Sequence, residues 1–205
     1  MVERERSLAF PGYQFTRWTD IIPQKPSVSN GVILEIGAGS TPMYMVSEAI
    51  LGKIRGGRAY IDIDMDREAL WQANRDKFGI AAEGDLEALP VRDGVADEVW
   101  ISNLFGSIEW LFMDKAAVFK ELHRVLKKDG LIHIVETYTP SVGLSNKNYK
   151  LFGLEEVSSF QGEEAWQFIA DNGITTLVSH HFKSNRKGSI ASKPSRAFIL
   201  TLRKI

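Results

Sequence analysis

The stretch Gly31 to Thr41, G-V-I-L-E-I-G-A-G-S-T, joins a short apolar run to two closely spaced glycines. The run is rich in β-branched residues, which is typical of a parallel strand buried on both faces. Gly37 and Gly39 carry no Cβ, so the backbone can turn sharply and a ligand can approach it. Pro42 suits the first position of a helix. The stretch therefore predicts a strand, a glycine turn and a helix, with a ligand at the carboxyl end of the strand.

The residues around these glycines indicate which ligand binds there. A dinucleotide-binding loop, G-x-G-x-x-G, binds a pyrophosphate and would have a third glycine where this chain has Pro42. Glu35 places a carboxylate two residues before Gly37, where it would repel a pyrophosphate and attract a cation. Both departures disfavour an NAD-dependent oxidoreductase. The E-x-G-x-G pattern resembles motif I of the class I S-adenosylmethionine (SAM)-dependent methyltransferases, whose cofactor carries an ammonium, a sulfonium and no phosphate.

Length and composition narrow the class of protein. The 205 residues are 44% hydrophobic, which suits one domain with a full core. A net charge of −1 gives no overall attraction to nucleic acid or to a membrane surface. Because there is no cysteine, disulfides and thiolate chemistry are excluded, and the four histidines show no metal-ligand spacing, so no metal is expected. No signal peptide or membrane-spanning stretch is found, and a cytoplasmic protein is expected.

Further segments resemble the same family in order and spacing, so the similarity covers residues 31–136. They are A-Y-I-D-I-D at 59–64, G-D-L-E-A-L-P at 84–90 and E-L-H-R-V-L-K-K-D-G-L-I-H-I at 121–134. The resemblance implies one α/β domain over 1–205, with a Rossmann-like doubly wound sheet of seven strands, mostly parallel with an antiparallel C-terminal strand. Strands are expected at 31–36, 59–64, 79–83, 96–102, 131–135, 174–181 and 197–202. Helices are expected after Pro42, from 65 to 77, from Asp114 to 127–130, and at 163–172.

The resemblance also implies which residues bind SAM. A carboxylate at the end of the second strand can accept two hydrogen bonds from the ribose hydroxyls. Asp62 and Asp64 share a face, and Asp64, nearer the strand end, is preferred. Asp85 is expected to accept from the adenine amino group, and the Leu86 N–H to meet a ring nitrogen. The full expected set is Glu35, Gly37, Ala38, Gly39, Ser40, Asp64, Met65, Asp85, Leu86, Asn103 and Leu104.

The methyl acceptor is expected beyond the fourth strand. Phe105 should face the transferring methyl group, and 137–162 should form a substrate-side insertion. Residues 1–30, which include Tyr13, should form either a lid over the cofactor or a cap on the core. Transfer by SN2 attack needs alignment more than a strong base. The candidates to orient or deprotonate the nucleophile are Glu109, Tyr138 and His181. The 182–196 link holds five basic residues and no acid, which suits an anionic acceptor; they are Lys183, Arg186, Lys187, Lys193 and Arg196.

Three hypotheses for the acceptor follow. A small-molecule acceptor is favoured, because it is the commoner use of this short form. Some segments also resemble the aminoglycoside-resistance ribosomal RNA methyltransferases, but Phe105 stands where their P-W-G loop has tryptophan, and the 182–196 link has no tryptophan. RNA, ribosomal or transfer, is therefore the second hypothesis. A non-catalytic SAM- or nucleoside-binding domain is the third, since the chemistry requires no diagnostic catalytic residue. The sequence determines neither the methylated atom nor the oligomeric state.

Overall fold

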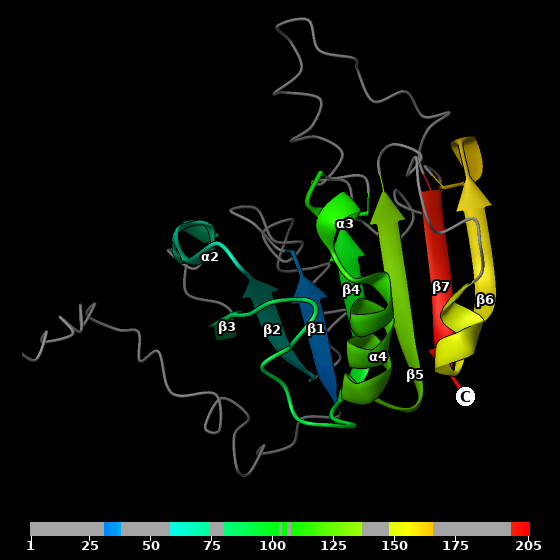
Figure 1. Cartoon of the computed structure of the whole chain (residues 1–205), viewed down its shortest axis with the longest axis horizontal. Coiled ribbons are helices and arrows are strands. Elements are labelled where there is room, and N and C mark those ends of the chain that lie inside the picture. Colours follow the sequence, from blue (N-terminus) through cyan, green and yellow to red (C-terminus); the bar gives the residue numbers. More distant parts are fainter. Residues whose placement is uncertain are drawn as a thin grey trace, which may run out of the picture.

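The computed structural model describes residues 31–37, 58–73, 80–102, 104–105, 108–136, 148–165 and 198–205. Within these ranges seven strands form one sheet in the order β3-β2-β1-β4-β5-β7-β6 (Figure 1). The strands are β1 (Val32–Ile36), β2 (Ala59–Asp64), β3 (Ile80–Glu83), β4 (Ala96–Ser102), β5 (Leu126–Glu136), β6 (Leu154–Gln161) and β7 (Phe198–Lys204). The helices are α2 (Arg67–Ala73), α3 (Ile108–Phe112), α4 (Lys115–Val125) and the 3-10 helix η3 (Asn148–Phe152).

The predicted sheet is confirmed in its strand number and directions. Strands β3, β2, β1, β4 and β5 are parallel, and β7 runs antiparallel to β5 and to the edge strand β6. The strand order reverses between β1 and β4, which is where ligands bind in open α/β sheets. On β1, Ile33 and Leu34 point to opposite faces and both are 0% exposed, so both faces of this strand are covered. The glycine stretch therefore begins at the centre of the sheet.

The two faces of the sheet differ in chemistry. One apolar row runs through paired positions on neighbouring strands, and all of its members are buried: Ile61, Leu34, Val99, Ile132 and Leu202. Helix α4 packs on this face with Val118, Phe119, Leu122 and Val125, which recur at helical spacing. On the other face the next paired row is polar and aromatic: Asp62, Glu35, Trp100, His133 and Thr201. The apolar face is the main hydrophobic core.

Helix α4 begins as predicted but ends earlier. The side chain of Asp114 accepts hydrogen bonds from Ala116 N–H and Ala117 N–H, at 2.9 and 3.3 Å, which is an N-cap. The expected end at 127–130 was wrong, because the chain enters β5 directly at Leu126. Asp129 has φ of 62°, in the left-handed region that glycine usually occupies. Gly130 meets a packing requirement instead, since an added Cβ would lie 2.9 Å from Leu126 Cδ2 and 3.0 Å from Lys127 O.

The edge strand β6 lies where no strand was expected. The 137–162 segment was predicted to be an insertion, yet Leu154–Gln161 pairs with β7. The sequence pattern of β6 does not alternate as a strand's usually does. Leu154 is buried while Glu156 and Val157 are both exposed, and the pairing shifts register between Glu156 and Ser158. Polar residues and a bulge are usual on an edge strand. The expected sixth strand, 174–181, lies outside the described residues.

Candidate functional site

The turn after β1 lies between the ends of its two neighbours. Gly37 has φ of 73°, as the glycine prediction required, and its N–H donates to Ile63 O on β2 at 2.8 Å. On the other side, an added Cβ at Gly37 would lie 3.9 Å from the side chain of Leu104, which follows β4. Gly37 and Leu104, both predicted cofactor residues, are therefore brought together at the strand-order reversal.

Glu35, another predicted cofactor residue, lies below this turn. Its side chain is on the polar face of β1, the residue is 1% exposed, and one carboxylate oxygen accepts from the Tyr60 hydroxyl. Asp62 of β2 is its paired neighbour and is 0% exposed. Glu35 therefore lies inside the protein beneath the turn and does not reach the solvent-exposed edge.

Asp64 rather than Asp62 reaches the end of β2. Asp62 is fully buried, whereas Asp64 is half-buried and its Oδ1 accepts from Asp66 N–H at 2.8 Å. Asp66 in turn caps α2 by accepting from Glu68 N–H and Ala69 N–H at 2.9 and 3.0 Å. This geometry favours Asp64, as the sequence did, for a ligand at the strand ends. Met65, the next predicted residue, is 52% exposed.

Asp85 lies beside Asp64, because the turn after β3 is bonded to the end of β2. Gly84 N–H donates to Asp64 O at 2.9 Å. Asp85 is exposed, and its Oδ1 accepts from Glu87 N–H at 2.8 Å, which holds the turn in shape. Leu86 as a whole is 2% exposed, and its side chain belongs to the core. The two carboxylates predicted to bind the ribose and the adenine therefore follow neighbouring strands.

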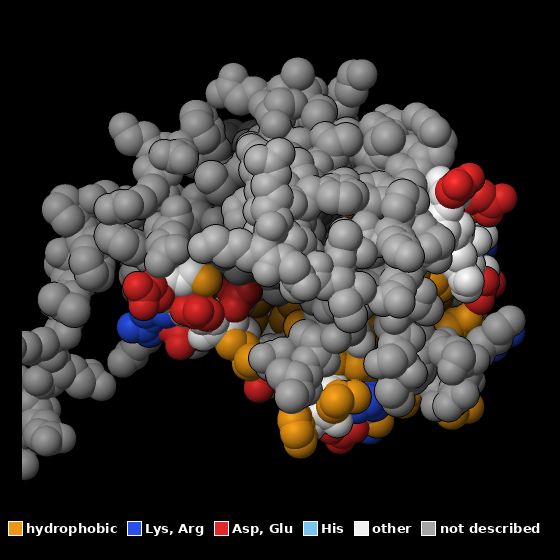
Figure 2. Space-filling model, turned by 90° about the horizontal axis from the view of Figure 1, so that it is seen from above, with side chains coloured by type: hydrophobic (Ala, Val, Ile, Leu, Met, Phe, Trp, Pro, Cys, Tyr) orange, Lys and Arg blue, Asp and Glu red, His pale blue; other side chains and the backbone are white. Residues whose placement is uncertain are grey.

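Among the described residues, acidic side chains gather at the part of this edge formed by β2, β3 and α2. Figure 2 looks down on the carboxyl ends of the strands and shows this group at its left, with a second acidic group at its right. The exposed or half-exposed acids of the left group are Asp64, Asp66, Glu68, Glu83 and Asp85. Arg67 is the basic residue among them, and it bonds to Glu83 with an N–O distance of 2.6 Å. A negative surface disfavours pyrophosphate and suits a neutral or cationic nucleoside.

The loop after β4 differs from its prediction at Phe105. The ring of Phe105, expected to face the methyl group, is 2% exposed, lies in the apolar core and packs on Trp110 with ring centroids 4.2 Å apart. Its backbone N–H donates to Glu136 Oε1 at 2.8 Å. The Phe105 ring therefore belongs to the core and is not presented to a substrate. Glu109 falls within α3, but its side chain is outside the described part of the chain.

Glu136 is a buried acid that the sequence analysis did not assign to the site. It ends β5 and is 0% exposed. The rule that singled out Asp64, an acid at the carboxyl end of a parallel strand, applies equally to it. Ser102, the last residue of β4, is also buried, and its hydroxyl has no hydrogen-bond partner within the residues that the structure covers. Both polar groups lie at the edge where β4 and β5 end.

We expect Glu136→Gln to preserve the loop and Glu136→Leu to disturb it. The glutamine carbonyl can still accept from Phe105 N–H, whereas leucine leaves that buried donor unpaired, at a cost of about 1–3 kcal/mol in the free energy of unfolding. Chemical denaturation measures this cost, and amide hydrogen exchange at Phe105 locates it. Equal stability and equal exchange in the two variants would show that the Glu136 bond does not hold the loop.

The remaining predicted site residues lie outside the described residues. They are Ala38, Gly39 and Ser40 of the glycine turn, Asn103 after β4, Tyr13 of the expected lid or cap, Tyr138, His181, and the basic residues Lys183, Arg186 and Lys187. They stay predictions.

The fold and this edge define the class of protein. A sheet of this order, with a glycine turn at the strand-order reversal and acids after β2 and β3, is the methyltransferase-type α/β fold. Residues 34–134 match the family model described as a methyltransferase domain. This part of the chain is therefore a methyltransferase domain, and the resemblance predicted from the sequence is confirmed.

Individual relatives agree with this family. A ubiquinone/menaquinone biosynthesis C-methyltransferase, UbiE, from Geotalea uraniireducens is 29% identical over 119 residues, or 56% of this chain. The chain spans about half, 48%, of that relative's length. The aminoglycoside resistance methyltransferase NpmB1 shares the fold with a TM-score of 0.61 at 16% identity, over 94% of this chain and 95% of that one. A SAM-dependent methyltransferase from Mesorhizobium loti does so with a TM-score of 0.57 at 12% identity, over 91% and 95%.

Proposed function

We propose that this protein binds SAM at the carboxyl ends of β1, β2, β3 and β4 and transfers its methyl group to an O or N nucleophile of a small-molecule acceptor. The single observation that carries the proposal is the position of Asp64 and Asp85. Asp64 ends β2 and Asp85 follows β3, the adjacent parallel strand. Gly84 N–H, directly before Asp85, donates to Asp64 O, next to a glycine turn of positive φ.

The residues at this edge suit SAM. Asp64 would bind the ribose hydroxyls, Asp85 the adenine amino group, and the backbone at Gly37 would admit the ligand because no Cβ blocks it. The acidic surface favours a cationic ligand over one that contains a pyrophosphate. When bound, SAM would supply an electrophilic methyl group. This chain's part in the reaction would be to hold the nucleophile in line and exclude water.

The proposal of a small-molecule acceptor is supported by two observations. The UbiE relative is named for methylation in quinone biosynthesis. In addition, the Phe105 ring is buried against Trp110, so it is not presented for stacking on an RNA base.

Among the described residues, no helix is long and apolar enough to cross a membrane.

Calorimetric titration with SAM, S-adenosylhomocysteine (SAH) and NAD tests the cofactor. We expect binding of the first two and none of NAD. Asp64→Asn should weaken SAH binding about tenfold, since a carboxylate accepts from both ribose hydroxyls more strongly than an amide does. Glu68→Gln removes the same charge from the same surface and should leave affinity nearly unchanged. Absence of SAH binding by the wild-type protein would refute the proposal.

Transfer of a radiolabelled methyl group tests the acceptor. Ribosomal subunits, transfer RNA and a small-molecule metabolite fraction are incubated separately with labelled SAM and the protein. We expect label in the small-molecule fraction. Label in RNA alone would replace the proposed acceptor, and binding of SAM without transfer to any fraction would favour the non-catalytic hypothesis.

A further inference from the structure

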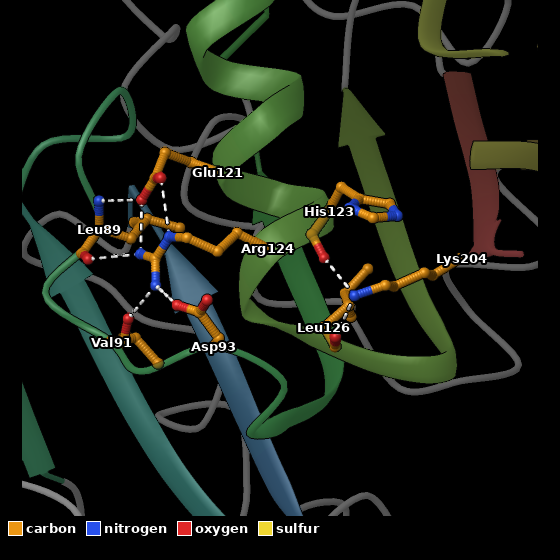
Figure 3. A network of polar contacts seen from close by, with 8 residues as sticks. All are labelled: Leu89, Val91, Asp93, Glu121, His123, Arg124, Leu126 and Lys204. Atoms are coloured by element: carbon orange, nitrogen blue, oxygen red, sulfur yellow. Dashed lines mark hydrogen bonds and ion pairs between the residues drawn. The ribbon is translucent and has the colours of Figure 1, made fainter. Parts of the chain in front are cut away.

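The segment from Gly84 to Gly94, between β3 and β4, is held by side chains of α4 (Figure 3). Arg124, in the last turn of α4, donates to the backbone oxygens of Leu89 and Val91, at 3.0 and 2.6 Å. It also bonds to the Asp93 carboxylate at 2.7 Å. A single guanidinium therefore connects three positions of the segment to one point on the helix, a geometry for which its planar set of five donors is suited.

Glu121, one helical turn earlier, completes the contact. Its carboxylate receives two bonds from Arg124, at 2.8 and 2.6 Å, and accepts from Leu89 N–H at 2.9 Å. Both polar backbone groups of Leu89 are thus bonded to α4. The bond from Arg124 lowers the pKa of Glu121, so the pair stays ionised at neutral pH. The side chains of Glu121 and Arg124 are only 18% and 29% exposed, which makes the pair stronger than a surface ion pair.

A second contact fixes the other part of the same segment. Glu87 Oε1 accepts from Asp114 N–H, at the start of α4, at 2.7 Å. Asp85 and Leu86 lie directly before Glu87, and Leu89 lies four residues after Asp85. Gly84 packs so closely on Pro90 that an added Cβ would lie 2.5 Å from Pro90 Cδ. The segment has little freedom to move independently of α4.

We propose that Glu121 and Arg124 are positioning residues for nucleoside binding: they fix the Gly84–Gly94 segment so that Asp85 and the Leu86 N–H meet the adenine base. This inference rests on the proposed function, because it assumes that Asp85 and Leu86 contact adenine. Neither Glu121 nor Arg124 would touch the cofactor.

The test compares Arg124→Gln with Lys120→Gln, which removes the same charge from an exposed position of the same helix. Affinity is measured by calorimetry for SAH and for S-inosylhomocysteine, in which a carbonyl oxygen replaces the adenine amino group. We expect wild-type protein to prefer SAH. Arg124→Gln should weaken SAH binding about tenfold and remove most of this preference, because a displaced Asp85 no longer accepts from the amino group. Lys120→Gln should keep both the wild-type affinity for SAH and the wild-type preference for SAH over S-inosylhomocysteine.

Amide hydrogen exchange provides a readout without ligand. In Arg124→Gln the Leu89 and Leu86 amides should exchange faster, while those of β4 and β5 remain protected. Glu121→Gln, which can still accept from Leu89 N–H, should give an intermediate loss of preference and keeps the test available if Arg124→Gln does not fold. A folded Arg124→Gln protein with wild-type preference for SAH would overturn this inference alone. Failure of wild-type protein to bind SAH would overturn the proposed function and this inference with it.

Discussion

Gly31→Ala is expected to destabilise the protein by about 3 kcal/mol or more, through a strained backbone and a steric clash together. Gly31 precedes β1 and has φ of 150°, a conformation that residues with a Cβ rarely adopt. An added Cβ would lie 2.3 Å from Asp97 Oδ2. Asp97 cannot move away without breaking two interactions, because this oxygen accepts a hydrogen bond from Val32 N–H at 2.6 Å and the carboxylate forms an ion pair with Lys127 at 2.8 Å.

Urea denaturation of three further proteins separates the two causes. Gly94→Ala places a Cβ at φ of 63°, with no atom nearer than Leu126 O at 4.0 Å, so it should cost only the backbone term of about 1 kcal/mol. In an Asp97→Ala background, Gly31→Ala should cost clearly less than in wild-type protein, as measured by a double-mutant cycle. Equal costs in the two backgrounds would show that the clash with Asp97 is not the cause.

The fold could be predicted closely where local sequence signals and tertiary position agree. The β-branched run of β1, the acid-ended strand β2 and the capped, amphipathic α4 each lie where the sequence placed them. β6 was missed because an edge strand has one open side, so buried and exposed residues need not alternate clearly along it. The end of α4 was expected at 127–130, where lysines followed by a glycine are a typical helix end, whereas Gly130 is required by close packing against Leu126.

The candidate site could be predicted where it depends on strand ends and not where it depends on side-chain packing. The position of Asp64 followed from its place at the end of β2. By contrast, no local signal indicated that the Phe105 ring would turn into the core against Trp110, because either orientation is compatible with a loop sequence. Contacts such as Glu136 with Phe105, or Arg124 with Leu89, join residues more than 30 positions apart. Such contacts depend on tertiary structure.

The polar row on the second sheet face leads to a prediction on acid stability. His133, on β5, has a pKa lowered to about 4, mainly by burial and also by the charge of Arg58, while Glu98 opposes this shift. Its ring stacks on Trp100 at 4.2 Å, and Nδ1 lies 3.2 Å from Thr201 Oγ1. The folded protein therefore holds this imidazole neutral at pH values where the unfolded chain would protonate it.

The direction of the pH effect follows from proton binding. Between the unfolded pKa near 6.5 and the folded pKa of about 4, the unfolded state binds one more proton at His133, so stability falls as the pH falls through this window. The full shift corresponds to about 3 kcal/mol. Chemical denaturation at intervals from pH 7 to pH 4 should show this loss in wild-type protein and not in His133→Gln, beyond the losses that both proteins share. If stability falls with pH equally in the wild-type and His133→Gln proteins, the prediction is contradicted. If stability is lost only when His133 is present, the packing of this sheet face, which also buries Glu35, Asp62 and Trp100, requires a neutral imidazole.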